Sequence, residues 1–289
     1  MRAAVMALLC AAAAVLAQPA KHVVVFGVDG LAASAVAEGR TPNMIALAKA
    51  GASTLHARAI LPTVSAPNWS AMIMGAGPDF TGVTSNDWRP GKGGGIESFC
   101  RDSGFHPPTI FGAMRKARPE AVSALFTDWD GFVPLVEPHA ASKVAVAKDD
   151  AGKTVREAMA YFTAQRPALL FIHVDHVDHA GHTLGWYTDA YYNAVAEADA
   201  LLGQVISAVD KSGLRKETVI LVTADHGGHG KEHGGMLQSD VEIPWIAAGP
   251  GIRAGTISGP VSTTQTAPSI ASWLGVKADE CWVARPVIR

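Results

Sequence analysis

Cysteine is scarce in this sequence, with three residues among 289 and no CxxC pair of the kind that holds zinc or performs redox chemistry. Charged residues are also few, at 17%, and the 24 basic residues do not outnumber the 26 acidic ones. This balance gives no support to nucleic acid as a partner. Hydrophobic residues make up 48%, which is typical of a compact globular chain and excludes a disordered one.

The apolar run at residues 3–16 is shorter than the ~20 residues that a membrane-spanning helix needs. It follows the single positive charge of Arg2 and ends beside the small residue Ala17, an order typical of a secretory signal peptide. We therefore expect residues 1–20 to act as a signal peptide, cleaved after Ala17 or Ala20, with no membrane anchor. The protein would be periplasmic or extracellular, and loss of Arg2 changes its formal net charge from -2 to -3.

The mature chain, residues 21–289, has a length that one large α/β domain can fill. Two cysteines remain in it, Cys100 and Cys281, and an oxidising compartment would allow them to pair. Their separation in sequence does not show whether they lie close together.

Short apolar runs alternate with longer amphipathic ones along this chain. Residues 22–28 (HVVVFGV) are uncharged and continuous, as expected for a buried parallel strand. A helix at 42–50 follows, with Thr41 as its N-cap and Pro42 in its first turn. Because helices separate the strands, the pattern predicts an α/β fold with a doubly wound, mostly parallel sheet flanked by helices. Further strands are expected at about 122–126, 168–174, 218–223 and 243–248, and helices at about 153–165, 188–209 and 264–274.

One segment departs from this alternation. Residues 88–108 are loop-like, with the glycine-rich sequence GKGGG at their centre. A phosphate-cradling loop would follow a strand and end in GK[ST], and this segment does neither. We expect a surface loop inserted near the functional site.

Acidic residues and histidines follow three of the predicted strands. Asp29 comes directly after the first strand, Asp225 and His226 follow TVILVTA, and Asp175 and Asp178 follow ALLFIHV. The carboxyl ends of parallel strands meet at one edge of the sheet, where ligands bind. A single Asp in such a place usually caps a helix, but capping does not explain three such strand ends, two of them with histidine.

Spacing leaves two candidate ligand pairs open. Asp178 and His182 lie four residues apart, and Asp175 and His179 have the same spacing, so one turn of chain can converge either pair on a metal. Seven of the eleven histidines fall in residues 173–233, and the last two, at 229 and 233, lie in the glycine-rich stretch DHGGHGKEHGG. Imidazole with carboxylate suits zinc, and suits iron or manganese less well. The alternative is a His-rich loop that binds metal adventitiously.

A nucleophile is expected in residues 61–75 (LPTVSAPNWSAMIMG). Pro67 is typical of the first turn of a helix that runs toward Gly75, which places Ser65 at its N-terminal end. Backbone N–H groups and the helix dipole favour an anion there. Thr63 and Ser65 are both possible nucleophiles, and a serine that merely caps the helix is the alternative.

Together these segments resemble the alkaline phosphatase superfamily, most closely its nucleotide pyrophosphatase/phosphodiesterase branch, over nearly the whole mature chain. PTVSAPNW resembles the nucleophile segment of the branch, which selects Ser65 over Thr63. GAGPDFTGVTSN resembles its phosphate-binding run and ends at Asn86. VDHAGHTLG resembles its second-metal motif, which selects Asp178 and His182, and TADHGGHG resembles its D-H-G motif.

The resemblance implies two divalent metal ions, preferably Zn²⁺, in a two-metal site ~3.5–4 Å apart. The implied ligands are Asp29, Ser65, Asp225 and His226 for the first ion, and Asp178, His182 and His233 for the second. His233 is preferred as the last ligand because His-Gly before the strand near residue 243 resembles short-loop members, and His229 is the alternative. Candidates for supporting a ligand or contacting substrate are His229, Asp175, His179, Trp69 and Trp88.

The implied reaction is hydrolysis of a small-molecule phosphate ester or nucleotide through a Ser65 phospho-enzyme, with Asn86 holding phosphate oxygens. A phosphodiesterase is preferred to an alkaline phosphomonoesterase, because no Lys or Arg is identified that would neutralise a dianionic phosphate. A sulfatase needs C/S-x-P-x-R, and Trp69 stands where that Arg should be. A metal-binding protein without catalysis would have no use for Ser65 and Asn86.

Overall fold

A computed structural model of the chain describes residues 19–38, 40–92, 96–99 and 108–288. Nearly all of the expected signal peptide lies outside these residues, as do Cys10, Cys100 and part of the expected 88–108 loop. Cys281 is disulfide-bonded, and its pairing with Cys100 stays a prediction. In the part of the chain that the structure describes, no helix combines the length and apolar character needed to cross a bilayer.

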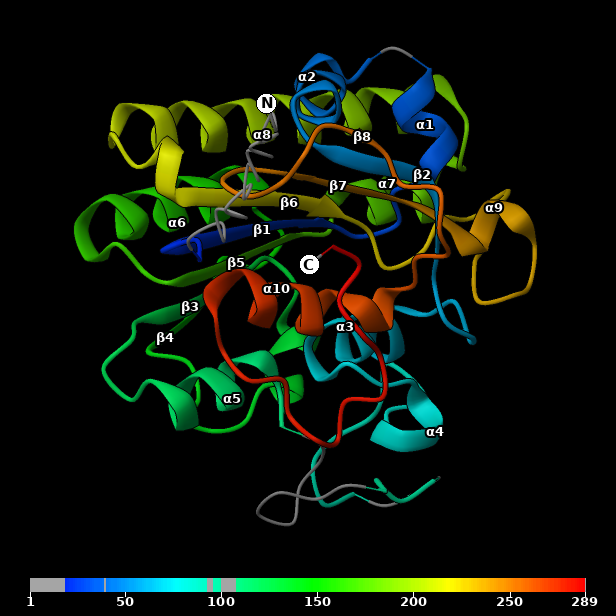
Figure 1. Cartoon of the computed structure of the whole chain (residues 1–289). Coiled ribbons are helices and arrows are strands. Elements are labelled where there is room, and N and C mark those ends of the chain that lie inside the picture. The colour runs from blue at the N-terminus through cyan, green and yellow to red at the C-terminus, as the bar shows by residue number, and fades with distance from the viewer. Residues whose placement is uncertain (1–18, 39, 93–95, 100–107, 289) are drawn as a thin grey trace, which may run out of the picture.

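Eight strands form one sheet across the described residues. The strands are β1 (His22–Val28), β2 (Ala52–Arg58), β3 (Ser123–Thr127), β4 (Lys143–Val146), β5 (Leu169–Val174), β6 (Thr218–Thr223), β7 (Glu242–Ala248) and β8 (Gly255–Thr256). Their order across the sheet is β4-β3-β5-β1-β6-β7-β2-β8 (Figure 1). Among these eight described strands, only β7 runs against its neighbours, antiparallel to β6 and β2. The predicted α/β fold with a mostly parallel sheet is therefore confirmed.

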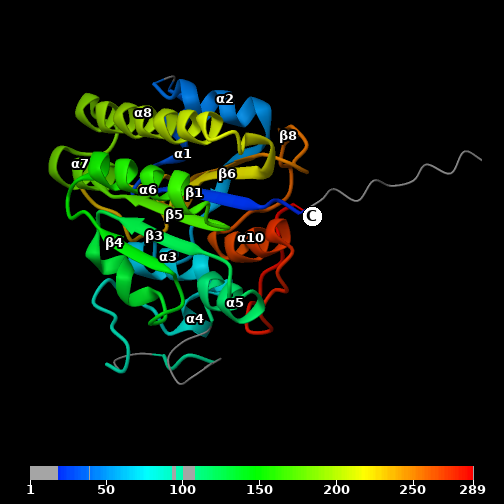
Figure 2. The ribbon, with the colours of Figure 1, turned by 90° about the vertical axis from the view of Figure 1, so that its left-hand side faces the viewer.

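Helices cover both faces of this sheet. They are α1 (Ala33–Ala37), α2 (Pro42–Ala50), α3 (Ser65–Met74), α4 (Pro78–Thr81), α5 (Ile110–Ala117), α6 (Ala151–Gln165), α7 (His176–Leu184), α8 (Asp189–Lys211), α9 (Gln238–Val241) and α10 (Thr266–Leu274). Short 3-10 turns lie at Asp130–Leu135, Arg215–Glu217 and Thr263–Gln265. Helices α1, α2, α6, α7 and α8 pack on one face, and α3, α5 and α10 on the other (Figures 1 and 2). Because both faces are covered, the central strands β1, β5 and β6 are buried at every residue, which explains their continuous apolar runs.

The predicted elements at 22–28, 218–223 and 42–50 have the same bounds as β1, β6 and α2. Three strands were not predicted. The sequence of β2, ASTLHAR, places polar and charged residues on a partly exposed strand, and β4 and β8 are short. Thr41 occupies the predicted N-cap position of α2, but its hydroxyl donates to the Val36 carbonyl at 2.9 Å instead of accepting a hydrogen bond from the helix.

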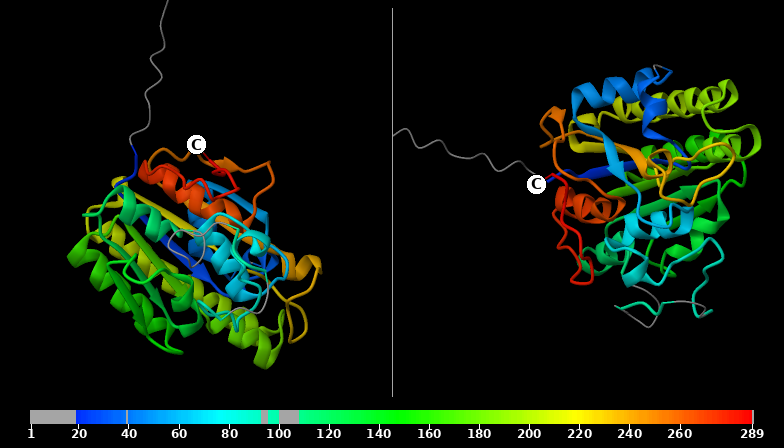
Figure 3. Two further views of the ribbon diagram at one scale, coloured as in Figure 1. Left: turned by 90° about the horizontal axis from the view of Figure 1, so that it is seen from below. Right: turned by 90° about the vertical axis from the view of Figure 1, so that its right-hand side faces the viewer.

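The register of the central strands brings their carboxyl ends level. Gly27 of β1 lies opposite His173 of β5 on one side and Thr223 of β6 on the other. The residues that follow these strands therefore leave the sheet at one edge (right-hand view of Figure 3). Glycine is required at position 27, since a Cβ there would lie 2.7 Å from the ring of Trp69.

Candidate metal centre and active site

The first cluster of site residues lies where β1 and β6 end. Asp29 Oδ1 lies 3.4 Å from Ser65 Oγ and 3.4 Å from His226 Nε2. His226 Nε2 is 3.3 Å from Ser65 Oγ and 3.2 Å from Asp225 Oδ2. All four side chains are buried. One oxygen of each carboxylate, one imidazole nitrogen and one hydroxyl therefore converge at the carboxyl edge of the sheet.

Ser65 begins α3, and Asn68 fixes the loop that leads into this helix. The Asn68 side chain accepts a hydrogen bond from the Ile60 amide at 2.7 Å and contacts three carbonyl oxygens of residues 60–64 through its NH₂ group. Val64 occupies the N-cap position, so the alternative of Ser65 as a helix cap is wrong. The Ser65 hydroxyl faces the first cluster at the positive end of the helix dipole, where an anion is favoured.

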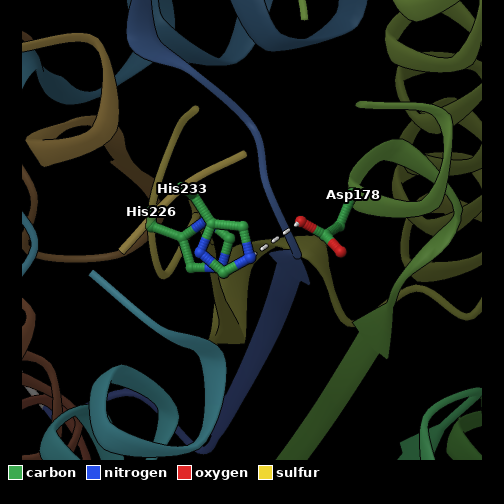
Figure 4. A group of neighbouring side chains, drawn as sticks. All are labelled: Asp178, His226 and His233. Atoms are coloured by element: carbon green, nitrogen blue, oxygen red, sulfur yellow. Dashed lines mark ion pairs between the residues drawn. The ribbon is translucent and has the colours of Figure 1, made fainter. Parts of the chain in front are cut away.

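The second cluster consists of Asp178 and His182 from α7 and His233 from the loop after β6. Figure 4 draws Asp178 and His233, together with His226 of the first cluster. His182 Nε2 lies 3.4 Å from Asp178 Oδ2 and 3.0 Å from His233 Nε2. His233 Nε2 is also 3.9 Å from Asp178 Oδ1, the ion pair drawn in Figure 4. The His233 ring stacks on His226 with their centroids 3.8 Å apart, so the two clusters adjoin. Gly30 turns the chain between them at φ +68°, where a Cβ would lie 2.7 Å from the Asp178 backbone.

Three imidazoles in these clusters share one hydrogen-bond pattern: those of His182, His226 and His233. Each Nδ1 lies 2.7 to 2.9 Å from a backbone carbonyl oxygen. The carbonyls belong to Lys231, Gly227 and Thr63 respectively. Because a carbonyl oxygen only accepts, each Nδ1 carries the hydrogen, and in the neutral ring Nε2 keeps its lone pair. All three Nε2 atoms face the clusters, as they do in metal-ligating histidines.

Negative charge is crowded in these clusters. Burial and then the charge of Asp29 raise the pKa of Asp225 well above its usual range, and the same two causes raise the pKa of Asp178. Burial also acts to raise the pKa of Asp29, but contacts with His173 and His226 outweigh it and hold that pKa below the usual range. Burial lowers the pKa of His226 to about 4, which keeps this ring neutral.

The residues present fit a divalent cation in each cluster. Asp225 Oδ2 and Asp178 Oδ1 are buried and have no hydrogen-bond partner among the residues that the structure describes. Leaving such an atom unsatisfied costs about 1–3 kcal/mol, and more for a charged group, which a bound cation would offset. Potential ligand atoms of Asp29, Asp225 and His226 all lie within 4.8 Å of one another, as do those of Asp178, His226 and His233. Carboxylate oxygens and imidazole nitrogens are the donors of zinc sites.

Asp175 and His179, the other pair with four-residue spacing, do not converge on either cluster. His179 is exposed, and its ring lies 3.5 Å from the Thr183 hydroxyl. Asp175 lies beside Asp29 and His173, with potential ligand atoms within 4.8 Å of one another. Burial and then the charge of Asp29 raise the pKa of Asp175 to about 7.

The two histidines of the glycine-rich stretch have different surroundings. His233 belongs to the second cluster, whereas His229 Nδ1 lies 2.7 Å from Asp240 Oδ1. Asp240 is fully buried, and its other oxygen accepts the Gly235 amide at 3.2 Å. His229 and Asp240 therefore brace the loop that carries His233.

Asn86 lies beside the start of α3. Its Oδ1 accepts the Ala66 amide at 2.8 Å. Since this bond uses the oxygen of the side-chain amide, the opposite NH₂ group is the part that can donate to a phosphate oxygen.

The two tryptophans proposed as supporting or substrate-contacting residues, Trp69 and Trp88, differ in how far they are buried and in what they contact. Trp69 is fully buried and donates from Nε1 to Asp29 Oδ2 at 2.8 Å. Of its two proposed roles, this position fits support of a candidate ligand and leaves no surface of the ring for substrate. Trp88 is half-buried and packs against the core.

The sequence motifs give no role to His173, yet this residue contacts the first cluster. Its Nε2 lies 3.1 Å from Asp29 Oδ2, and its Nδ1 lies 3.0 Å from Thr127 Oγ1. Burial acts to lower its pKa, but the carboxylates of Asp128 and Asp29 outweigh burial and raise that pKa to about 9. The available signal was a histidine inside the apolar run ALLFIHV, because a buried imidazole needs polar partners.

Solved structures share the fold of this chain at low sequence identity. Murine ectonucleotide pyrophosphatase/phosphodiesterase 5, an inactive variant in complex with AMP, superposes with a TM-score of 0.73 and 16% identity over 90% of this chain and 96% of that chain. A substituted variant of the alkaline phosphatase PafA superposes with a TM-score of 0.77 and 12% identity, over 93% and 98%. Both likenesses concern the fold.

Curated relatives match over a shorter stretch. Arylsulfatase K of zebrafish (Danio rerio) is 35% identical over 92 residues, which are 30% of this chain and 18% of that protein. Arylsulfatase K of chicken (Gallus gallus) is 41% identical over 68 residues, or 22% and 13%. The chain thus matches less than a fifth of the length of these relatives.

A family model covers far more of the chain. Residues 23–234, more than half of the sequence, match the model described as type I phosphodiesterase / nucleotide pyrophosphatase. This range includes Asp29, Ser65, both clusters and His233, and the alkaline-phosphatase-like superpositions agree with it. The chain therefore belongs to the type I phosphodiesterase / nucleotide pyrophosphatase family.

Proposed function

We propose that this protein is a metal-dependent phosphoric ester hydrolase that uses Ser65 as its nucleophile and acts on phosphate diesters or nucleotides. The observation that carries the proposal is the position of Ser65 Oγ, 3.4 Å from Asp29 Oδ1 and 3.3 Å from His226 Nε2 at the start of α3. A protein that only stored metal would have no use for a hydroxyl in this place.

Two divalent cations bound in the clusters would lower the pKa of the Ser65 hydroxyl and neutralise charge on the phosphate. Ser65 Oγ loses its proton to solvent and forms a bond to phosphorus as the bond from phosphorus to one ester oxygen breaks, and the departing alcohol takes up a proton from solvent. Water then attacks the phosphorus of the phosphoserine: its hydroxyl group stays on phosphorus, a proton returns to Ser65 Oγ, and a phosphate monoester is released. The N-terminus of α3 and the Asn86 NH₂ group hold the non-bridging oxygens in both steps.

The cationic side chains near these motifs favour a diester over a monoester. Arg89 donates to the carbonyls of Asn86 and Trp88 at 2.9 and 2.7 Å, and Lys231 donates to the Thr183 carbonyl at 2.8 Å. Both cations thus point at backbone oxygens, whereas a dianionic monoester needs more positive charge than a monoanionic diester. The AMP bound to the murine relative supports a nucleotide as the ester.

Sulfate-ester hydrolysis is the second candidate, because the curated matches are to arylsulfatase K. A sulfatase of this superfamily carries Arg four residues after its modified Cys or Ser. Here Trp69 holds that position, and it is buried against Asp29. We therefore place this candidate second.

Purified protein loaded with Zn²⁺ would be assayed on bis-p-nitrophenyl phosphate, p-nitrophenyl phosphate, p-nitrophenyl sulfate and a nucleotide diester. We expect the highest kcat/KM on a diester and no turnover of the sulfate. Ser65→Ala is expected to lower kcat by roughly a thousandfold or more while zinc stays bound, because the nucleophile is removed and the other ligands remain.

Ser70→Ala is the matched control for this substitution. Ser70 lies in the same helix and is fully buried, but its hydroxyl donates to the Pro67 carbonyl at 2.8 Å. This variant should keep its turnover. Unchanged kcat in Ser65→Ala would remove Ser65 from the mechanism, and preferred turnover of the sulfate would favour the second candidate.

We also propose that the protein is exported, because the residues at its N-terminus follow the order typical of a signal peptide. Ala20 is buried, and its amide donates to the Trp273 carbonyl at 2.8 Å. Cleavage after Ala17 keeps this contact, whereas cleavage after Ala20 removes it. N-terminal sequencing of the protein from a secreting host is expected to start at Gln18, and an unprocessed N-terminus would contradict export.

A further inference from the structure

Asp29, the carboxylate after β1, is held from behind by two ring N–H groups. Trp69 Nε1 donates to its Oδ2 at 2.8 Å, and His173 Nε2 lies 3.1 Å from the same oxygen. A carboxylate at this distance can only accept, so His173 Nε2 carries a hydrogen and donates it. This is the opposite of the three imidazoles whose Nε2 atoms face the clusters, and it sets His173 apart from the ligands.

The His173 ring is itself fixed in orientation. Its Nδ1 lies 3.0 Å from Thr127 Oγ1 on the neighbouring strand β3. Three aromatic rings surround it, those of Trp69, Phe132 and Trp129, with centroids 4.7, 5.3 and 5.9 Å from the imidazole. His173 and Trp69 are both fully buried. The two donors to Asp29 therefore have no room to turn away from it.

Asp225, the other carboxylate of the first cluster, is held in the same way. Its Oδ1 accepts the Gly30 amide at 3.1 Å, and its Oδ2 is buried and accepts no hydrogen bond within the described part of the chain. In each carboxylate one oxygen is thus occupied by protein donors. The other oxygen, Oδ1 of Asp29 and Oδ2 of Asp225, lies within 3.4 Å of His226 Nε2.

We propose that Trp69 and His173 are positioning residues that restrict Asp29 to a single ligating oxygen. A carboxylate free to rotate can present both oxygens to a cation. With Oδ2 tied to two ring N–H groups, only Oδ1 faces the cluster, and Ser65 Oγ beside it keeps a coordination position of its own. The inference rests on the proposed metal site but not on the identity of the ester.

The test uses Trp69→Phe and His173→Phe, each of which removes one donor and keeps an aromatic ring. Trp245→Phe is the matched control for the first, because Trp245 is fully buried and its Nε1 donates to none of the described residues. His22→Phe is the control for the second. His22 is buried at the opposite end of β1, with its Nδ1 2.8 Å from the Pro167 carbonyl. His173→Gln restores an N–H donor and serves as the rescue variant.

Zinc affinity of the first cluster would be measured by chelator competition in a His182→Ala background, which removes a ligand of the second cluster. Supporting residues behind a metal ligand typically contribute 10–100-fold to affinity. We expect Trp69→Phe and His173→Phe each to weaken zinc binding about tenfold or more, and His173→Gln to recover most of the loss. Trp245→Phe and His22→Phe should bind zinc as the parent does, and thermal unfolding checks that all variants fold.

Absorption of the Co²⁺-loaded proteins provides a second readout, because a change of Asp29 from one to two ligating oxygens alters the coordination number. Zinc affinity within threefold of the parent in both Phe variants would overturn the inference, as would an equal loss in the two controls. If the parent itself binds no zinc, the proposed metal site fails together with the inference. Normal zinc binding by every variant overturns the inference alone.

Discussion

At the scale of single residues, hydrogen-bond direction separates the ligand candidates from their supports. His182, His226 and His233 each donate from Nδ1 to a backbone carbonyl and turn Nε2 into the clusters. His229 lies four residues before His233 in the same glycine-rich stretch, yet its ring faces Asp240. Residue type alone does not distinguish these two histidines, because both are imidazoles in a loop that permits close approach.

This difference predicts opposite outcomes for two alanine variants. His233→Ala is expected to bind one zinc ion per chain instead of two and to lose at least a hundredfold in kcat, since the second cluster loses a ligand. His229→Ala should keep both ions but lose about 1–3 kcal/mol of stability, because buried Asp240 loses a partner. Metal content by mass spectrometry and denaturant unfolding would measure both. One zinc in His229→Ala and two in His233→Ala would reverse the assignment.

At the scale of elements, the site depends on how the ends of strands and helices are held. Strands β1, β5 and β6 end level with one another, so the residues that follow them meet at one edge. The proposed nucleophile, Ser65, lies on α3, which packs on the face of the sheet opposite to α7 (Figure 1). Asn68 sets its position, because it ties residues 60–64 to the first turn of this helix.

Asn68→Ala is therefore expected to affect both stability and catalysis. Loss of its buried hydrogen bonds should cost about 2–4 kcal/mol, and displacement of Ser65 should lower kcat on the diester. Asn43→Ala is the control: its amide contacts Asp199 at 2.8 Å, remote from the site, so stability should fall without a change in kcat. The prediction fails if Asn68→Ala is destabilised yet keeps the kcat of the parent.

At the scale of the whole molecule, charge at the sheet edge opposes the stability of the core. The central strands are fully buried, and buried carboxylates lie at their ends. Asp178 and Asp225 each have a buried oxygen that makes no hydrogen bond to any residue that the structure describes. Cations in the clusters would thus stabilise the fold as well as supply chemistry.

Removal of metal is expected to lower the Tm by roughly 10 °C, since a ligand at a thousandfold excess over its Kd contributes about 4 kcal/mol and 1 kcal/mol shifts Tm by about 2–4 °C in a chain of this size. Calorimetry before and after dialysis against a chelator would measure this, with zinc re-addition as the control. An unchanged Tm would contradict the metal sites.

The difference in Tm between the metal-loaded and the metal-free protein should also increase from pH 5 to pH 8. Burial and the charge of Asp29 raise the pKa values of Asp225 and Asp178, so protons compete with zinc at low pH. In the metal-free fold, stability that depends on the protonated carboxyls is lost as pH rises from about 4 through these raised values. A difference that narrows with rising pH would contradict this sign.

The order of residues predicts the central strands β1, β5 and β6 and the acidic residues and histidines that follow them, because burial on both faces and the carboxyl-edge rule can be read from the sequence. Strands β2, β4 and β8 were not predicted from it. The residues also leave two choices open, Thr63 or Ser65 and Asp178/His182 or Asp175/His179, and the family resemblance is what selects between them. The folded structure is needed to show which oxygen of each carboxylate is free, that Trp69 is buried against Asp29, and that His173 lies behind it. These features depend on contacts between residues 40 to 195 positions apart, and on the direction of hydrogen bonds, which no local pattern encodes.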